Sequence, residues 1–214
     1  MRAIKLIALF ATTLGSLPVW AQPAIPAGPP ADLATNRPAY LTQIKHVSGP
    51  GLLPGDFAYV TFGTNKFGFV RPAGFRLEMT DAQKVTLISA DLSCLLTFRV
   101  LEPLAPGTSE LDPAPYRDLL ISRHPGCKIL EELSQNAVNR SGPVFDLRWN
   151  ATGAVQRRER ILFIPSDAGV LEFSLVSSLE SFEAGRQGFN ALLITFRAAD
   201  ADGRINMPQL SNRL

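Results

Sequence analysis

The most regular pattern of hydrophobic and polar positions lies near the C-terminal end of the chain, from Ser177 to Arg197. Apolar residues recur there at spacings of three, four and seven, which places them along one stripe of an α-helix. Ser177 followed by Glu180 three residues later is the capping-box pattern, so we expect the helix to begin at Ser177. The stripe consists of Leu179, Phe182, Phe189, Leu192, Leu193 and Phe196. None of these side chains binds a metal or transfers a proton, so we interpret the stripe as a packing face.

Strand-like segments rich in branched and aromatic residues fill most of the remaining chain. Between Val144 and Trp149 apolar and polar residues alternate strictly, so the segment has two distinct faces. Gly63–Asn65, Asp91–Ser93 and Ser166–Gly169 have the composition of tight turns between strands. The predicted strands are Phe57–Phe62, Lys66–Val70, Phe75–Met79, Lys84–Ala90, Cys94–Leu101, Val144–Trp149, Arg160–Pro165 and Val170–Val176.

A second, shorter helix is predicted after Asp112, which can cap it, and Pro113, which suits its first turn. Its apolar stripe contains Tyr116, Leu119, Leu120 and Arg123, and the helix is expected to end at Pro125-Gly126. The order of elements is strands, a helix, more strands and a long helix. This order indicates an α+β fold with an antiparallel sheet and helices packed on it, because alternating βαβ units are missing from the pattern.

The N-terminus has the pattern of an export signal. Arg2 and Lys5 are followed by a mostly apolar run that ends near Leu17, with Val19-Trp20-Ala21 before the expected cut. The run is too short for a stable membrane span. We expect cleavage after Ala21 and a protein that is exported to the periplasm or secreted.

Composition divides the chain into four segments. Residues 1–21 are the signal peptide, residues 22–45 a flexible linker, residues 46–198 one domain, and residues 199–214 a polar tail. The stretch from Gln22 to Pro38 holds five prolines and few bulky apolar residues, so it cannot nucleate a core. Folded structure is expected to start between Ala39 and Phe57.

Charge argues against general binding to nucleic acid or anionic lipid. The chain has 21 Lys and Arg against 19 Asp and Glu. Removal of residues 1–21, which hold two basic and no acidic side chains, leaves 19 of each. Electrostatic binding to a polyanion needs a surplus of positive charge on at least one face, which a neutral composition does not provide by itself.

The two cysteines, Cys94 and Cys127, leave two interpretations open. In an oxidising compartment they could form a disulfide, which would close a loop of roughly 30 residues and contribute on the order of 3 kcal/mol. They could equally be two separate thiols, since the sequence contains no distance between them.

Sites for catalysis find little support in the sequence. His46 and His124 are the two histidines, and no G-x-S-x-G motif accompanies them. Metal-ligand clusters and phosphate-binding glycine loops are missing as well. The segment Asp200–Ile205 faintly resembles a calcium loop but lacks both the leading acid and the closing glutamate. We therefore expect a non-enzymatic protein without a cofactor.

One polar cluster is a candidate for partner binding. Arg158 and Arg160 alternate in the sequence "RRER" and would share one face of a strand, with Arg148 on the preceding strand. Paired guanidinium groups suit a carboxylate or phosphate on a partner. The alternative is a solvated hairpin end or a charged sheet edge that protects against aggregation.

Three stretches resemble the PsbP-like domains, including the bacterial DcrB-like members. They are "FGFVRPAGF" from Phe67, "DPAPYRDLLISRHPGCKILEE" with the following "SGPVFDLRWN", and "VLEFSLVSSLESFEAGRQGFNALLITFR". The resemblance spans Phe67 to Ala198 and contains no catalytic signature. Phe75 stands where the family often has tryptophan, and Thr195 where it often has serine.

The resemblance implies an α/β/α sandwich in which helices flank a central antiparallel sheet, with the long C-terminal helix across one face. It also implies a protein that binds or assists protein partners. The expected function is therefore non-enzymatic binding of a protein partner or envelope component. The alternative is a carrier that holds a small apolar ligand between the sheet and a helix.

Overall fold

The computed structural model describes residues 39–47, 55–81, 84–102, 111–151, 155–200 and 203–205. The signal peptide, residues 22–38 of the linker and residues 206–214 of the tail lie outside these ranges. The described elements are β1 (Ala39–Val47), β2 (Gly55–Phe62), β3 (Asn65–Val70), β4 (Phe75–Asp81), β5 (Lys84–Ser89), β6 (Cys94–Leu101), α1 (Pro113–Arg123), β7 (Lys128–Ala137), β8 (Arg140–Asn150), β9 (Gln156–Ser166), β10 (Gly169–Ser177), α2 (Phe182–Thr195) and β11 (Arg197–Ala198).

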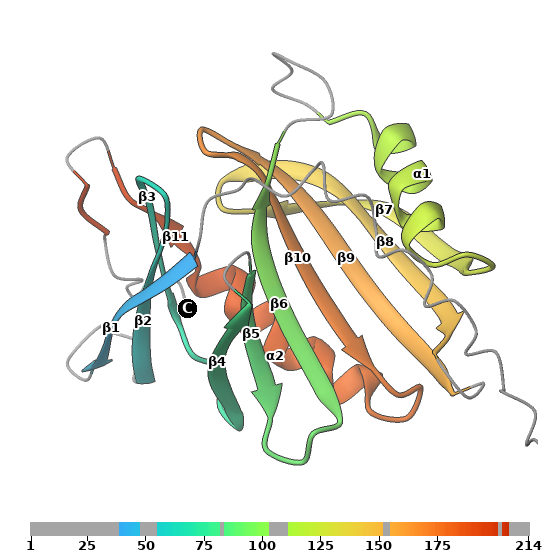
Figure 1. The fold of residues 1–214 in the computed structure, drawn as a ribbon, viewed down its shortest axis with the longest axis horizontal. Helices are drawn as coiled ribbons and strands as arrows, with labels where there is room; N and C mark the ends of the chain where they lie inside the picture. Colours follow the sequence, from blue (N-terminus) through green and yellow to red (C-terminus); the bar gives the residue numbers. More distant parts are fainter. Residues whose placement is uncertain are drawn as a thin grey trace, which may run out of the picture.

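The strands form two antiparallel sheets (Figure 1). The larger has the order β4-β5-β6-β10-β9-β8-β7, and the smaller has the order β1-β2-β3-β11. The α+β class and the antiparallel pairing are therefore confirmed, and a second, smaller sheet stands beside the large one. The chain leaves the small sheet after β3 through Pro72 and Gly74, whose φ of 78° is a conformation that glycine adopts without strain. This turn redirects the chain into β4 and the large sheet.

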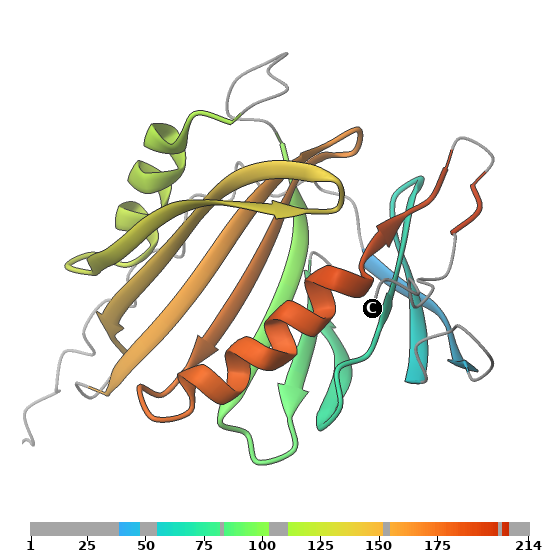
Figure 2. The same cartoon turned by 180° about the vertical axis from the view of Figure 1, so that it is seen from behind.

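Helix α2 crosses one face of the large sheet (Figure 2). Its apolar stripe is buried as predicted from Phe182 onward. The predicted start at Ser177 was wrong, because Ser177 still pairs with Cys94 and Arg158 as the last residue of β10. Ser181 occupies the N-cap position without a side-chain hydrogen bond to the first turn, and Leu179, which precedes it, is 43% exposed.

Phe98 on β6 lies where α2 and the two sheets meet. Its ring centroid is 5.1–6.3 Å from those of five other phenylalanines, within the range of favourable ring contacts. We call this set the ring cluster. It consists of Phe98 with Phe62 and the β3 residues Phe67 and Phe69, Phe173 of β10, and Phe196 after α2.

Helix α1 packs on the other face of the large sheet. The Asp112 carboxylate accepts a hydrogen bond from the Ala114 amide at 3.0 Å, so the predicted cap is confirmed. Tyr116 lies against Phe163 with ring centroids 4.5 Å apart. Leu119 and Leu120 are buried in the same apolar cluster. The predicted stripe and the end of the helix before Pro125 are both confirmed.

Folded structure begins earlier than the predicted domain start at residue 46. Strand β1 pairs with β2 from Ala39 onward, so residues 39–45 belong to the small sheet and not to the linker. At the other end, the Ala199 amide donates to the Lys66 carbonyl at 2.9 Å. The first residue of the predicted tail is therefore held against β3.

Replacement of Phe98 by alanine is expected to lower the free energy of unfolding by about 3–5 kcal/mol, because it opens a cavity among the other rings. Ile121→Ala, which truncates a side chain that is 46% exposed on α1, should cost less than about 1 kcal/mol. Urea unfolding measures both variants. Equal losses in the two would contradict the central role of the ring cluster.

Candidate functional site

Two of the three predicted arginines converge on one buried carboxylate. Asp146 of β8 is 2% exposed and lies opposite Arg160 of β9. Arg160 Nε donates to Asp146 Oδ1 at 2.6 Å, and Arg158 Nη2 donates to Oδ2 at 3.0 Å. Both arginines face α2, and the Arg158 guanidinium lies 3.9 Å from the centroid of the Phe182 ring. Arg158 and Arg160 thus share a face, as predicted, and help to fix the fold.

Arg148 does not take part in this bridge. It lies opposite Arg158 in the β8–β9 register, on the face that Asp146 also occupies. The interpretation of the cluster as a sheet edge was wrong for Arg158 and Arg160, because β9 is an interior strand and β7 is the edge.

Replacement of Arg160 by methionine is expected to destabilise the protein by about 3–5 kcal/mol, because it leaves the buried Asp146 carboxylate without its bidentate partner. Arg140→Met breaks the exposed ion pair with Asp167 and should cost no more than about 1 kcal/mol. Thermal unfolding at neutral pH compares the two. A loss for Arg160→Met as small as that for Arg140→Met would show that the Asp146 bridge is dispensable.

On the opposite face, ionic contacts attach α1 to the large sheet. Glu172 of β10 accepts from Arg123 at 2.7 Å and pairs with Arg99 at 2.8 Å. Burial lowers the pKa of the Arg123 guanidinium, although the Glu172 carboxylate opposes that shift. His124 and Trp149 both contact the Glu159 carboxylate, at 3.1 and 3.0 Å. These groups therefore hold the helix in place.

Of the two interpretations left open for the cysteines, the structure has the two separate thiols. Cys94 and Cys127 are both free. The register aligns Cys94 on β6 with Ser177, Arg158, Arg148 and finally Lys128, the residue after Cys127. Four strand spacings separate the two thiols, or about 19 Å, whereas a disulfide requires Cα atoms within about 7 Å.

Both thiols are expected to be recovered from folded protein that has not been reduced. Burial first, and then the Glu159 carboxylate, raises the pKa of the Cys127 thiol, so alkylation at neutral pH should be slower than for a free cysteine. Cys94 is buried and should react only on unfolding. Intact mass after iodoacetamide treatment measures this. Unfolded, unreduced protein that takes up no label would establish a disulfide.

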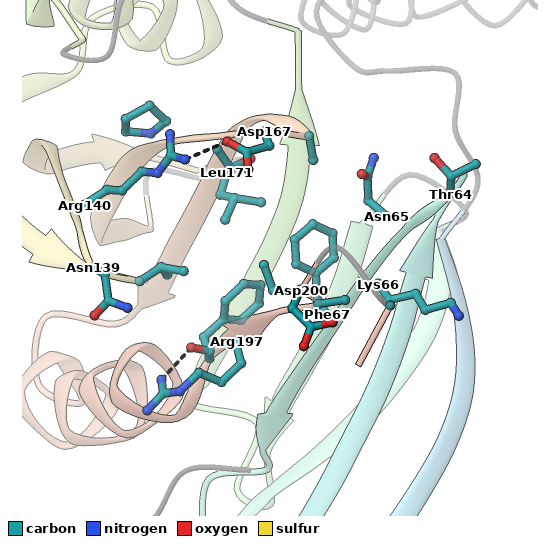
Figure 3. Close-up of a pocket in the computed structure, with 18 residues that line it drawn as sticks. Thr64, Asn65, Lys66, Phe67, Asn139, Arg140, Asp167, Leu171, Arg197 and Asp200 are labelled. Atoms are coloured by element: carbon teal, nitrogen blue, oxygen red, sulfur yellow. Dashed lines mark hydrogen bonds and ion pairs between the residues drawn. The ribbon is translucent and has the colours of Figure 1, made fainter. Parts of the chain in front are cut away.

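A cleft of about 460 Å³ opens between the two sheets (Figure 3). Phe67 of β3, Leu171 of β10 and Phe196 at the end of α2 lie beneath its apolar floor and are themselves buried, with 0–1% exposure. The β7–β8 and β9–β10 turns supply one wall through Val138 and Ala168, which also pack on the core. The cleft therefore joins the large sheet, the small sheet and the end of α2 in one surface.

Charged and amide side chains surround this apolar floor (Figure 3). Arg140 Nη2 pairs with Asp167 Oδ1 at 2.6 Å, and the Asp167 side chain is 93% exposed. Arg197 donates to the carbonyls of Ile194 and Phe196 at 2.8 and 2.7 Å. The remaining polar side chains at the rim include Lys66, Asp200, Asn65 and Asn139.

A second pocket, of about 540 Å³, lies where the small sheet meets the last turn of α2. At its polar end the Asp56 carboxylate accepts from Arg71 and lies 3.1 Å from His46 Nδ1. Hydrogen bonds from Arg71 and then His46 hold the pKa of Asp56 below its ordinary value. The apolar lining consists of Val70, Pro72, Ala73, Ala191 and Ile194.

The cleft was not foreseen from the sequence. Its walls come from three turns. The sequence predicts two of them, Gly63–Asn65 and Ser166–Gly169, from their composition. The third, Val138-Asn139, has positive φ at both residues, and its asparagine was the available turn signal. Among the described residues, no group of three His, Cys, Asp or Glu side chains is placed to hold a metal ion. Neither described helix is both long and apolar enough to cross a membrane.

Comparisons find likeness in structure and none in sequence. No protein-family model matches the chain, and no curated protein matches it. A cyanobacterial PsbP from Synechocystis is similar, with 12% identity and a TM-score of 0.46 over 61% of this chain and 85% of that one. The resemblance to PsbP that was noted in the sequence thus recurs among solved structures.

Two further structures are similar to the chain. LpqN, involved in cell envelope biogenesis of Mycobacterium tuberculosis, has 14% identity and a TM-score of 0.40 over 76% of this chain and 92% of that one. A protein of unknown function from Pseudomonas aeruginosa has 15% identity and a TM-score of 0.40 over 55% and 92%. Identities this low carry no information about activity.

Proposed function

We propose that the protein is an exported, non-enzymatic binding domain of the PsbP-like type, with helices flanking a central sheet, which engages a protein partner in the periplasm. The cleft between the two sheets carries this proposal. The N-terminal signal pattern supports export, and the attachment site is the described cleft, in which half-buried Val138 and Ala168 and exposed Ala198 supply apolar surface inside a charged rim.

The mixed lining of the cleft favours a polypeptide over a purely apolar molecule. Apolar atoms of Val138, Ala168 and Ala198 can contact a partner's side chain, while charged and amide groups around them can meet backbone and polar groups. The Arg140–Asp167 ion pair at the rim is exposed and therefore contributes little stability. A charged group of a partner can replace either residue of the pair with little loss of free energy.

The side chains of the cleft are suited to binding and lack an activated nucleophile. The hydroxyl of Ser166 donates to the Gly169 carbonyl at 2.8 Å, and the lining includes neither histidine nor cysteine. Lys66, Arg140 and Arg197 supply positive charge, and Asp167 and Asp200 supply negative charge. Such a surface recognises a partner through complementary charge and shape.

A photo-crosslinking amino acid placed at Asp167 is expected to capture one dominant envelope protein in cells. The same group at Gln187, an exposed α2 position that is not part of the cleft lining, serves as the matched control. Ala198→Trp, which fills the cleft from β11, should abolish capture from Asp167, whereas Ala184→Trp on exposed α2 should not. Mass spectrometry identifies the captured protein. Equal capture from Gln187, or capture that survives Ala198→Trp, would contradict the proposal.

The apolar lining of the pocket at Ala73 and Ile194 favours a second function, transport of a small apolar ligand. The same preparation distinguishes the two functions. If no protein is captured from Asp167 and native mass spectrometry shows an apolar molecule that Ala191→Trp displaces, carriage of that molecule replaces partner binding.

A further inference from the structure

Three basic residues form a row across neighbouring strands of the large sheet. Arg148 of β8 lies opposite Arg158 of β9 on one side and opposite Lys128 of β7 on the other. Residues paired in this way point to the same face, with Cβ atoms about 4.5–5.5 Å apart. We call Lys128, Arg148 and Arg158 the cationic row. It extends from the Phe182 ring of α2 to the edge strand of the sheet.

The nearby carboxylates do not neutralise this row. Asp146 is engaged by Arg158 and Arg160, and Glu131 lies 3.7 Å from Arg160. In the part of the chain that the structure describes, no carboxylate is within ion-pair distance of Lys128 or Arg148. Like charges directly opposite each other destabilise a sheet, so an external anion on the row would relieve this repulsion.

Asp146 is an example of a carboxylate bound by arginines on this face. It pairs with Arg160, next to the Arg148–Arg158 pair. Its carboxylate bridges two guanidinium groups, with Oδ2 at 3.0 Å from Arg158 Nη2 and 3.1 Å from Arg160 Nη2. A carboxylate from outside the chain that lies between Arg148 and Lys128 would meet the same type of donors at the same strand spacing. The Nε atom of Arg158 is buried without a hydrogen-bond partner, so the donors in this region are not exhausted.

We propose that the cationic row docks an acidic segment of a protein partner, with aspartate or glutamate side chains over Arg148 and Lys128. This proposal rests on the proposed function, because it adds a second contact for the same partner. The two contacts are separate because they lie at opposite ends of β9. The row is near the connection between β8 and β9, and the cleft is at the turn between β9 and β10. Positive charge on one face thus coexists with a composition that is neutral after removal of residues 1–21.

The position of the row beside β7 favours a polypeptide over a lipid headgroup. Strand β7 is the outermost strand of the large sheet and is largely exposed along its length. A polypeptide that crosses the row can continue along β7 and form backbone hydrogen bonds, which a lipid headgroup cannot do. The bulge between Ile129 and Glu131 limits how far such pairing extends.

The test measures binding of an end-blocked oligoglutamate peptide to the mature protein by fluorescence anisotropy. The double variant Lys128→Gln/Arg148→Gln removes two row charges and leaves Arg158, Arg160 and Asp146 in place. The control Arg157→Gln removes one charge from β9, the strand that carries Arg158. Arg157 pairs with Trp149 and points to the other face of the sheet. Expected results are about tenfold weaker binding for the double variant and less than twofold for the control. Added salt should weaken wild-type binding.

Several outcomes would overturn the proposal. They are no measurable binding of oligoglutamate, equal losses in the double variant and the control, and stronger row-dependent binding to phosphatidylglycerol vesicles than to the peptide. The Ala198→Trp variant separates this proposal from the function of the cleft, because it should still bind oligoglutamate. Partner capture from Asp167 that is independent of the row would contradict the second contact and leave the proposed function intact.

Discussion

The contact of Phe98 with its neighbouring rings is the interaction on which the rest of the structure depends. It brings β6 of the large sheet, β3 of the small sheet and the end of α2 to one point. The contacts of Phe67 and Phe69 with Phe196, and the hydrogen bond from the Val70 amide to Thr195 Oγ1 at 3.2 Å, extend this junction between the small sheet and α2. The cleft lies directly beside the cluster, since Phe67 and Phe196 belong to both. Packing in the core therefore determines the shape of the candidate binding surface.

Charge serves different purposes on the two faces of the large sheet. On the α1 face, Glu172 forms an ion pair with Arg123, and Glu159 lies 3.1 Å from His124 Nε2. Helix and sheet are therefore joined by polar contacts as well as apolar packing. On the α2 face, Asp146 joins two residues of a neighbouring strand, and the charges around it are only partly compensated. The contacts on the α1 face hold the helix against the sheet and cover it. On the α2 face, positive charge remains available for binding near the edge strand β7.

The sequence predicts features that depend on neighbouring residues and misses those that depend on distant ones. Asp112 and Pro113 specify the start of α1 locally, and the structure places that start as predicted. Ser177 has an equally good local pattern, but strand pairing with Cys94 and Arg158 keeps it in β10. Local capping contributes about 1 kcal/mol, less than a continued ladder in a buried sheet.

The candidate site follows the same rule. Alternation correctly placed Arg158 and Arg160 on one face, yet the sequence does not reveal that Asp146 lies beneath them, because this depends on the β8–β9 register. The walls of the cleft come from turns far apart in the chain. Two of these turns are recognised from composition, and Asn139 marks the third only weakly, but the convergence of all three is a property of the folded sheets.

The two-residue strand β11 has a mechanical consequence for the cleft. Only Arg197 and Ala198 pair with Gly68 and Phe67, while Phe196, immediately before them, is held in the ring cluster. So short a ladder can detach without disturbing the core, with Phe196 acting as a fixed pivot. Because Phe62, Phe67 and Phe69 keep the small sheet in the ring cluster, the part that can move is the segment after Phe196, with the rim side chains of Arg197 and Asp200. The width of the opening on this side is therefore set by a short ladder and not by the core.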